Sequence, residues 1–196
     1  MKTYAYVFLS VIMFMCMQPL CAQHNNEDLK KEIQSLKQQI ADQSHTYDMI
    51  LKGIDDNLWF NRVGDVAYID KVKITSTPRW RAKDPNDRFA GNKLQFHSYI
   101  FIPKNIDTSK KYPLIVLPHG GVHADFTTYH THIVREMIAQ GYVVVAPEYR
   151  GSTGYGKDVY ENIDYGGREN DDVLESRNYM VENYSFIDKS RIAVVG

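Results

Sequence analysis

The sequence predicts an α/β fold with a mostly parallel sheet, antiparallel first strands and a preceding amphipathic or coiled-coil helix. Residues 113–118 and 142–147 are continuous apolar runs, which is typical of strands buried on both faces of a sheet. Residues 127–140, which separate these runs, have helical periodicity. Residues 93–103 alternate between apolar and polar, which indicates a half-buried antiparallel strand. Strands that alternate with helices favour a parallel α/β sheet.

The N-terminus has the features of a secretory signal peptide. Lys2 supplies a positive charge, residues 4–17 are apolar, Pro19 interrupts this stretch, and residues 20–22 precede a predicted cleavage ahead of Gln23. The apolar stretch is shorter than the about 20 residues of a transmembrane helix. We therefore expect a secreted or periplasmic protein with no membrane span after cleavage; the alternatives are an N-terminal anchor, a buried helix or a lipoprotein. Both cysteines fall in this segment, so the mature chain has no thiol chemistry.

Residues 27–58 predict a helix with a heptad-like spacing of apolar side chains, interrupted at Gln43. The apolar positions are Leu29, Ile33, Leu36, Ile40, Tyr47, Ile50 and Ile54. The pattern fits a short coiled coil that forms a homo-oligomer through the first four, and equally an amphipathic helix that packs on its own domain or acts as a spacer. Gly53 and residues 55–57 predict that the helix ends there. The expected organisation is a signal peptide over 1–22, a helical segment over 23–62 and an α/β domain over 63–196.

The remaining elements follow from local patterns. Residues 66–75 predict a strand, and the segment up to residue 93, with Pro78, Pro85 and Gly91, predicts a loop. In the helix over 127–140 the expected inward side chains are Tyr129, Ile133, Val134, Met137 and Ile138, with Gly141 as the stop.

The last third of the chain predicts a glycine-rich loop over 151–167, a helix over 169–184 and a third buried strand starting at Arg191. The expected inward side chains of this helix are Val173, Leu174, Met180, Val181 and Tyr184.

The charge balance excludes one large class of partners. The 196 residues hold 23 Lys plus Arg and 24 Asp plus Glu, for a net charge of −1. A strongly basic nucleic-acid binder is therefore not expected.

Three segments carry a family resemblance. Residues 112–121, Y-P-L-I-V-L-P-H-G-G, resemble the strand and oxyanion loop of an α/β-hydrolase. Residues 149–156, Y-R-G-S-T-G-Y-G, are similar to a loop of the prolyl oligopeptidase family of serine peptidases, and residues 188–196, D-K-S-R-I-A-V-V-G, resemble that family's approach to its nucleophile. The resemblance spans about residues 93–196 and implies the N-terminal half of an α/β-hydrolase domain.

The resemblance also implies where the catalytic residues belong. In this family the nucleophile lies in a G-x-S-x-G elbow after a buried strand, and the Asp and His of the triad follow it. Gly196 falls at the first glycine, so the serine is expected two residues after it. We therefore expect a truncated chain with no catalytic residue of its own and no activity.

The other half of such a site is the oxyanion hole, whose backbone N–H groups stabilise the developing negative charge. The resemblance assigns this role to Gly121, with Gly120 beside it; a simple turn is the alternative. We expect His119 to support the loop by hydrogen bonding. Arg150 is expected to anchor its loop through an ion pair with one of three carboxylates, those of Glu148, Glu169 and Asp172.

Other chemistry-bearing residues are interpreted as structural. Ser152 lacks the strand-serine-helix context of a nucleophile. A metal site is not expected, although four histidines crowd together at positions 119, 123, 130 and 132. Tyr155 and Tyr160 fit a pocket wall or aromatic packing equally well.

The predicted function is a secreted serine hydrolase of this family that cleaves peptide or ester bonds through an acyl-enzyme, without a cofactor. Val122 and Glu148 depart from the family pattern, where Pro and Asn are common. The segment before the first strand is too short for the β-propeller typical of the family, which needs at least four blades of about 40–45 residues. A carbohydrate or acyl esterase therefore stays an alternative, as does a non-enzymatic coiled-coil module with a vestigial hydrolase domain.

Overall fold

The computed structural model describes residues 2–77 and 94–196, with side chains from residue 26 onward. Most of the loop predicted before residue 93 lies outside these residues. The chain divides into two compact units, Met1–Ser44 and His45–Gly196. The first unit is helical throughout its described length, and the second holds the sheet and all other elements.

Helix α1 runs from Lys2 to Val63, so the prediction that it ends near Gly53 is wrong. The helix also continues through Pro19. Helix α1 continues past Gly53 because its last turns pack against the rest of the second unit. Trp59 and Val63 are fully buried against the sheet, and this packing outweighs the local helix-ending signals.

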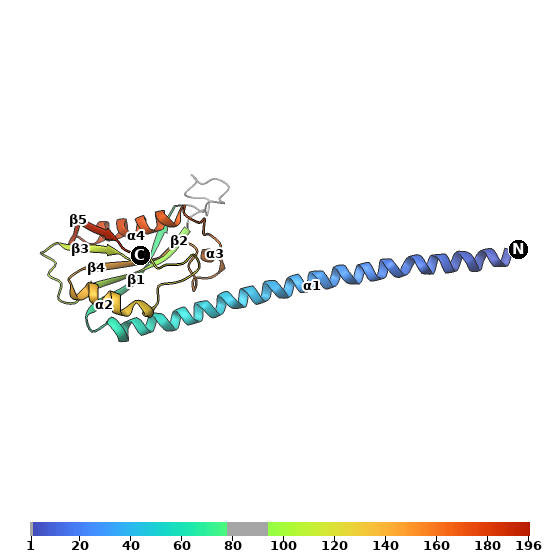
Figure 1. Ribbon diagram of the computed structural model, residues 1–196, viewed down its shortest axis with the longest axis horizontal. Coiled ribbons are helices and arrows are strands. Elements are labelled where there is room, and N and C mark those ends of the chain that lie inside the picture. The colour runs from blue at the N-terminus through green and yellow to red at the C-terminus, as the bar shows by residue number, and fades with distance from the viewer. Residues whose placement is uncertain (1, 78–93) are drawn as a thin grey trace. The chain divides into compact units, whose positions relative to one another are not determined.

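The sheet has five strands in the order β1-β2-β4-β3-β5 (Figure 1). Their bounds are β1 Ala67–Ser76, β2 Leu94–Pro103, β3 Tyr112–Val116, β4 Val143–Glu148 and β5 Ile187–Val194. β2 pairs antiparallel with β1 and with β4, whereas β3 pairs parallel with β4 and β5. The predicted α/β fold, mostly parallel with antiparallel first strands, is confirmed.

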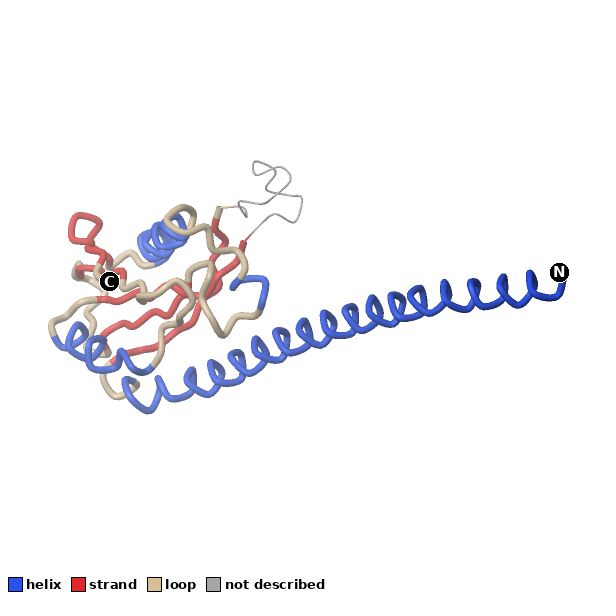
Figure 2. The backbone as a smooth tube through the Cα atoms, turned by 45° about the vertical axis from the view of Figure 1, so that its right-hand side comes forward, coloured by secondary structure: helices blue, strands red, loops and turns tan. Residues whose placement is uncertain are grey.

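Helices cover both faces of this sheet in the second unit (Figure 2). The 3₁₀ turn η1 Thr128–His130 leads into α2 Thr131–Ala139, which lies with the end of α1 on one face. Helix α4 Glu169–Asn183 lies on the other face, and the short α3 Lys157–Tyr160 interrupts the loop after β4. Gly141 has a φ of 83°, as a glycine that stops a helix requires.

Two hydrophobic cores follow from this layering. One combines Trp59, Phe126 and Val134 with the sheet side chains on that face, and the other joins Met180 to the opposite face. Strand β2 contributes to both, because Tyr99 points to the first core and Ile100 to the second. The prediction that this strand is half-buried is therefore wrong for its second half. β2 lies between β1 and β4, and α1 and α2 cover the face that was expected to be exposed.

Three further expectations on burial are wrong. Tyr129 is 78% exposed because it lies in η1, ahead of the helix whose inward face it was assigned to. Leu174 is 53% exposed, although the neighbouring Val173 packs against the core. The strand predicted from Arg191 begins earlier, at Ile187, and its end is exposed because β5 lies at the edge of the sheet, with only β3 beside it.

Candidate functional site

The candidate site is centred on the loop that leaves the carboxyl end of β3. Gly121 has a φ of 83°, a backbone conformation that a residue with a Cβ rarely adopts. A Cβ placed on Gly120 would meet no atom within 4 Å, so the backbone here is open to approach. Among the hydrogen bonds of the described residues, none uses the backbone N–H of Gly121. The loop thus offers a free donor on an accessible backbone, which is what an oxyanion hole requires.

Two stacked rings contact the backbone carbonyl groups of this loop. The rings of His119 and Tyr149 lie 4.3 Å apart and nearly parallel. The Tyr149 hydroxyl lies 2.9 Å from the carbonyl oxygen of His119 and 2.7 Å from that of Gly121. His119 Nδ1 lies 3.2 Å from the carbonyl oxygen of Gly120. Three successive loop carbonyls therefore lie within hydrogen-bond distance of these two side chains, and this restrains the peptide groups between them.

His119 also contacts a serine and a carboxylate, but the arrangement is not a catalytic triad. Its Nε2 lies 2.8 Å from Ser152 Oγ and 3.4 Å from Glu148 Oε2. In a triad the serine and the carboxylate bind opposite nitrogens of the imidazole, whereas here both face the same one. Ser152 and Glu148 are fully buried, so substrate has no access to them. Burial lowers the pKa of His119 to about 4, so the ring is neutral at neutral pH. Ser152 Oγ also lies 2.6 Å from the carbonyl oxygen of Tyr149, within its own loop, and its contact with His119 joins that loop to the glycine loop.

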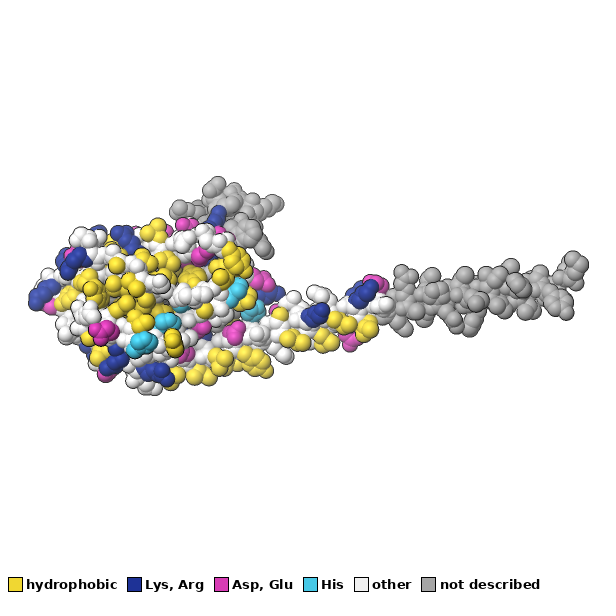
Figure 3. Space-filling model, viewed as in Figure 1, with side chains coloured by type: hydrophobic (Ala, Val, Ile, Leu, Met, Phe, Trp, Pro, Cys, Tyr) yellow, Lys and Arg dark blue, Asp and Glu magenta, His cyan; other side chains and the backbone are white. Residues whose placement is uncertain are grey.

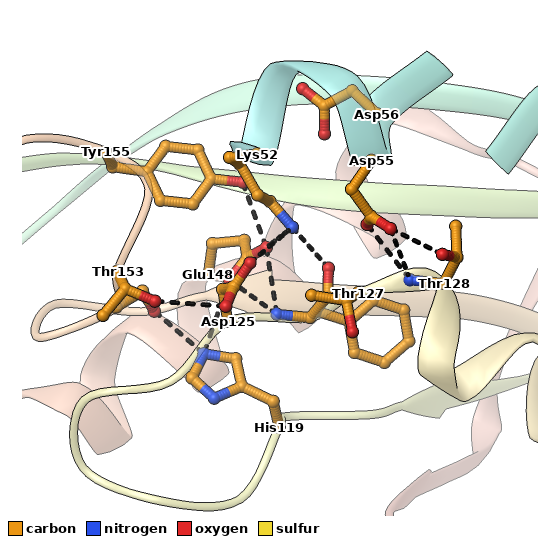
Figure 4. A network of polar contacts seen from close by, with 12 residues as sticks. Lys52, Asp55, Asp56, His119, Asp125, Thr127, Thr128, Glu148, Thr153 and Tyr155 are labelled. Atoms are coloured by element: carbon orange, nitrogen blue, oxygen red, sulfur yellow. Dashed lines mark hydrogen bonds and ion pairs between the residues drawn. The ribbon is translucent and has the colours of Figure 1, made fainter. Parts of the chain in front are cut away.

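Glu148 is the centre of a buried polar network (Figure 4). It ends β4 and accepts hydrogen bonds from the backbone N–H of Phe126, at 3.1 Å, and from the Tyr155 hydroxyl, at 3.0 Å. Lys52 Nζ lies 2.8 Å from Glu148 Oε1, 3.3 Å from Asp125 Oδ2 and in contact with the carbonyl oxygen of Phe126. Burial raises the pKa of Glu148 to about 7 despite the lysine. Helix α1 is thereby joined to the segment that follows the glycine loop.

Sequence reasoning missed this contribution of α1. The side chains of α1 that face the domain follow a second periodic set, at Lys52, Asp56, Trp59 and Val63, with spacings of 4, 3 and 4 residues. Asp56 accepts a hydrogen bond from the Tyr99 hydroxyl. This set was overlooked because half of its members are charged, and charged side chains are rarely buried unless paired. The heptad-like spacing of these four residues was the feature of the sequence that could have revealed them.

Arg150 lies under the loop that follows β4 and is fully buried. Its Nη2 lies 2.7 Å from Asp172 Oδ1 and its Nε lies 2.8 Å from Oδ2 of the same carboxylate. Its Nη2 also donates to the carbonyl oxygen of Thr77, at 3.1 Å. Of the three carboxylates considered from the sequence, the partner is therefore Asp172 of α4. The pair links the loop to α4 and leaves the guanidinium no access to a substrate.

A cavity of about 450 Å³ opens beside the glycine loop. Its lining includes His119, Gly121 and Val122 on one side, and Tyr165 and Glu169 on the other. Tyr165 has a φ of 56°, an uncommon conformation for a residue with a side chain and one found at ligand sites more often than elsewhere. Glu169 Oε1 accepts the N–H of Gly167, at 3.1 Å, while its buried Oε2 has no partner within the described part of the chain. The cavity thus combines apolar side chains with the backbone of the glycine loop and a glutamate whose Oε2 is buried.

Tyr155 and Tyr160 do not belong to the lining of this cavity. Tyr155 stacks on His97 with ring centroids 5.0 Å apart, and Tyr160 stacks on His123 at 3.7 Å. His130 stacks on Phe126. The crowded histidines are thus held in separate aromatic contacts, and no group of three metal-binding side chains occurs within residues 26–77 and 94–196.

The end of β5 lies against the same loop. A Cβ added at Gly196 would come within 2.9 Å of the carbonyl oxygen of Pro118, so only glycine fits there without a shift. The backbone N–H of Val195 donates to the carbonyl oxygen of Val116, at 2.9 Å. β3 and β5 are parallel neighbours, so their carboxyl ends meet at one edge of the sheet.

Comparison with known proteins matches this part of the chain to one family. Residues 128–196 fit the family model described as the prolyl oligopeptidase family. Over these residues the chain is similar to part of a prolyl oligopeptidase family domain. The resemblance inferred from the three motifs is thereby confirmed.

Individual relatives agree with this family. A probable dipeptidyl-peptidase 5 of Emericella nidulans is 37% identical over 112 residues, which cover 55% of this chain and 16% of that protein. Dipeptidyl-peptidase 5 of Aspergillus fumigatus is 35% identical over 127 residues, 61% of this chain and 18% of that protein. The chain therefore spans less than a fifth of the length of these relatives.

Solved structures agree with the fold. An acylaminoacyl peptidase in complex with Z-Gly-Gly-Phe-chloromethyl ketone has a TM-score of 0.53 at 21% identity, over 66% of this chain and 19% of that one. Acylaminoacyl peptidase of Pyrococcus horikoshii gives a TM-score of 0.51 at 21% identity, with the same coverage of both chains. At this identity the likeness concerns the fold alone.

Proposed function

We propose that residues 94–196 form the oxyanion half of a serine hydrolase site that cleaves peptide bonds through an acyl-enzyme. The single observation that carries this proposal is the contact of Gly196 with Pro118, the residue that leads from β3 into the Gly120-Gly121 loop. A serine two residues after Gly196 would emerge beside the free N–H of Gly121. The substrate carbonyl would then be attacked by the serine while its oxygen accepts a hydrogen bond from Gly121.

In this proposal the nucleophile, the base and its orienting carboxylate all come from residues that follow Gly196 in a longer polypeptide. The 196-residue chain by itself is then inactive. The family match and the peptidase names of the relatives support a peptide substrate.

The test compares the product of the complete reading frame with the 196-residue chain. Both are assayed with dipeptidyl anilides that have a free or a blocked amino group, and with acyl esters of a nitrophenol. The proposal expects the complete product to cleave the anilides in a way that a serine-directed inhibitor abolishes, and the 196-residue chain to cleave nothing. Cleavage of esters alone would favour the esterase alternative, and hydrolysis by the 196-residue chain would contradict the proposal.

We also propose that the protein is secreted after removal of residues 1–22. Within the part of the chain that the structure describes, no helix has both the length and the hydrophobicity needed to cross a bilayer. N-terminal sequencing of the protein recovered from its native host tests the proposal directly. The expected first residue is Gln23, and an intact Met1 would contradict it.

A further inference from the structure

Helix α1 carries an exposed apolar stripe. The side chains of the stripe are 43–65% exposed, and successive members are spaced alternately by three and four residues. One position of this repeat is polar and is occupied by Gln43. The apolar members are Leu29, Ile33, Leu36, Ile40, Tyr47, Ile50 and Ile54. Figure 3 shows hydrophobic side chains following one side of the described helix. A seven-residue apolar repeat over more than three heptads is the pattern of a coiled coil. We call these residues the apolar stripe.

Within the second unit, the stripe residues Tyr47, Ile50 and Ile54 stay exposed while the same part of the helix packs on the domain. Lys52, which anchors the helix to Glu148, lies two residues from Ile50 and two from Ile54. At 3.6 residues per turn, two residues correspond to roughly 200° around the helix, so Lys52 points away from the stripe. Trp59, seven residues after Lys52, lies on the same inward face. One face of α1 therefore binds the domain while the opposite face is available to a partner.

We propose that the apolar stripe pairs with the same stripe of a second copy of this chain, in a parallel, two-stranded coiled coil in register. Ile33 and Ile40 occupy one of the two core positions of the repeat, and Leu29 and Leu36 occupy the other. β-Branched residues at the first core position with leucine at the second favour parallel dimers. Gln43 adds a polar core residue, a device that fixes register and number of strands at some cost in stability.

The charges beside the stripe favour the same orientation. Glu32 precedes the core position of Ile33, and Lys37 follows that of Leu36. In a parallel pair in register, Glu32 of each copy faces Lys37 of the other copy, which makes two attractive contacts per dimer. In an antiparallel pair the positions of Lys30 and Lys37 would face each other, and like charges would meet.

Cysteine cross-linking tests the proposed pairing. In the full chain, Cys16 and Cys21 are replaced by serine, and one cysteine is introduced as Leu36→Cys in the core or as Gln38→Cys on the outer face. Mild oxidation is expected to join the Leu36→Cys chains into a disulfide-linked dimer and to leave the Gln38→Cys chains monomeric on a denaturing gel. Equal yields from the two variants, or no Leu36→Cys dimer, would overturn the proposal. A monomer or a trimer in sedimentation equilibrium of the unaltered chain would overturn it too.

Charge reversal tests the orientation without reference to any activity. Glu32→Lys and Lys37→Glu each replace two attractive contacts by two repulsive ones, which is expected to weaken the dimer about tenfold. A mixture of the two variants is expected to form heterodimers as tight as the unaltered dimer, because both contacts become attractive again. The urea unfolding of the α/β unit is expected to stay unchanged, since Glu32 and Lys37 are exposed and lie outside it. Failure of the mixture to restore the dimer would overturn the parallel register.

Discussion

Replacement of Lys52 by methionine tests how helix α1 is fixed to the domain. Lys52 Nζ is buried and lies 2.8 Å from Glu148 Oε1, so Lys52→Met leaves a buried carboxylate without its cation. Breaking a buried pair from one side costs about 3–5 kcal/mol. Methionine keeps most of the volume of the lysine stem, so the loss comes mainly from charge and not from a cavity.

The loss of stability caused by Lys52→Met depends on pH because the pKa of Glu148 lies close to neutral pH. Its pKa in the folded protein is about 7, above the ordinary 4.5, because of burial. The folded state therefore holds the proton more tightly than the unfolded state, and the stability of the unaltered chain falls as the pH rises through this interval. At about 1.4 kcal/mol for each pKa unit, the fall is roughly 3 kcal/mol. Without Lys52, the pKa of Glu148 rises further and the charged form becomes still less favourable.

We therefore expect Lys52→Met to destabilise the α/β unit by about 3 kcal/mol at pH 8 and by about 2 kcal/mol at pH 5.5, where Glu148 is protonated, because a pKa of about 7 for Glu148 limits the extra cost at pH 8 to roughly 1.4 kcal/mol. Urea unfolding followed by the fluorescence of Trp59, which is fully buried beside this network, measures both values. Lys31→Met, which removes an exposed lysine of the same helix, is the matched control and is expected to change neither. Lys52→Met combined with Glu148→Gln is expected to regain most of the loss at pH 8. An equal loss at both pH values, or a loss below about 1 kcal/mol at pH 8, would refute the assignment of a charged pair.

Three further outcomes follow from the loops around the glycine site. Arg150→Met is expected to cost about 3–5 kcal/mol in urea unfolding, because Asp172 then becomes a buried charge without its partner; a cost near zero would contradict the buried pair. Tyr149→Phe removes the hydroxyl that contacts two loop carbonyls, so a loss of about 1–3 kcal/mol in urea unfolding is expected; an unchanged stability would contradict the support role. Gly154→Ala places a Cβ 2.7 Å from the Lys52 side chain at a φ of 81°, so thermal unfolding is expected to show at least about 1 kcal/mol of destabilisation, and an unchanged melting temperature would contradict the close contact.

The sheet was predictable from the sequence because each buried strand is marked by a pattern within its own few residues. The apolar runs over 113–118 and 142–147 each became a buried parallel strand, since burial on both faces requires an uninterrupted apolar run. The loop of Gly120 and Gly121 was singled out by its resemblance to an oxyanion loop; Gly121 has the positive φ that favours glycine, and its role in catalysis stays a prediction.

The contribution of α1 was not predictable in the same way. A pattern of apolar and polar residues assigns charged side chains to the surface, whereas Lys52 is buried because Glu148 and Asp125, far along the chain, supply partners. The end of α1 was misplaced for the same reason, since the contacts of Trp59 are tertiary. Residue types alone indicate which groups need partners, and only the fold determines which partners they meet.

Labelling with a fluorophosphonate, followed by peptide mapping, tests the central claim most directly. We expect the product of the complete reading frame to carry the label on the serine two residues after Gly196, and the 196-residue chain to remain unlabelled. A label on Ser152, or on any other residue up to Gly196, would contradict the claim that these residues supply only the oxyanion half of the site.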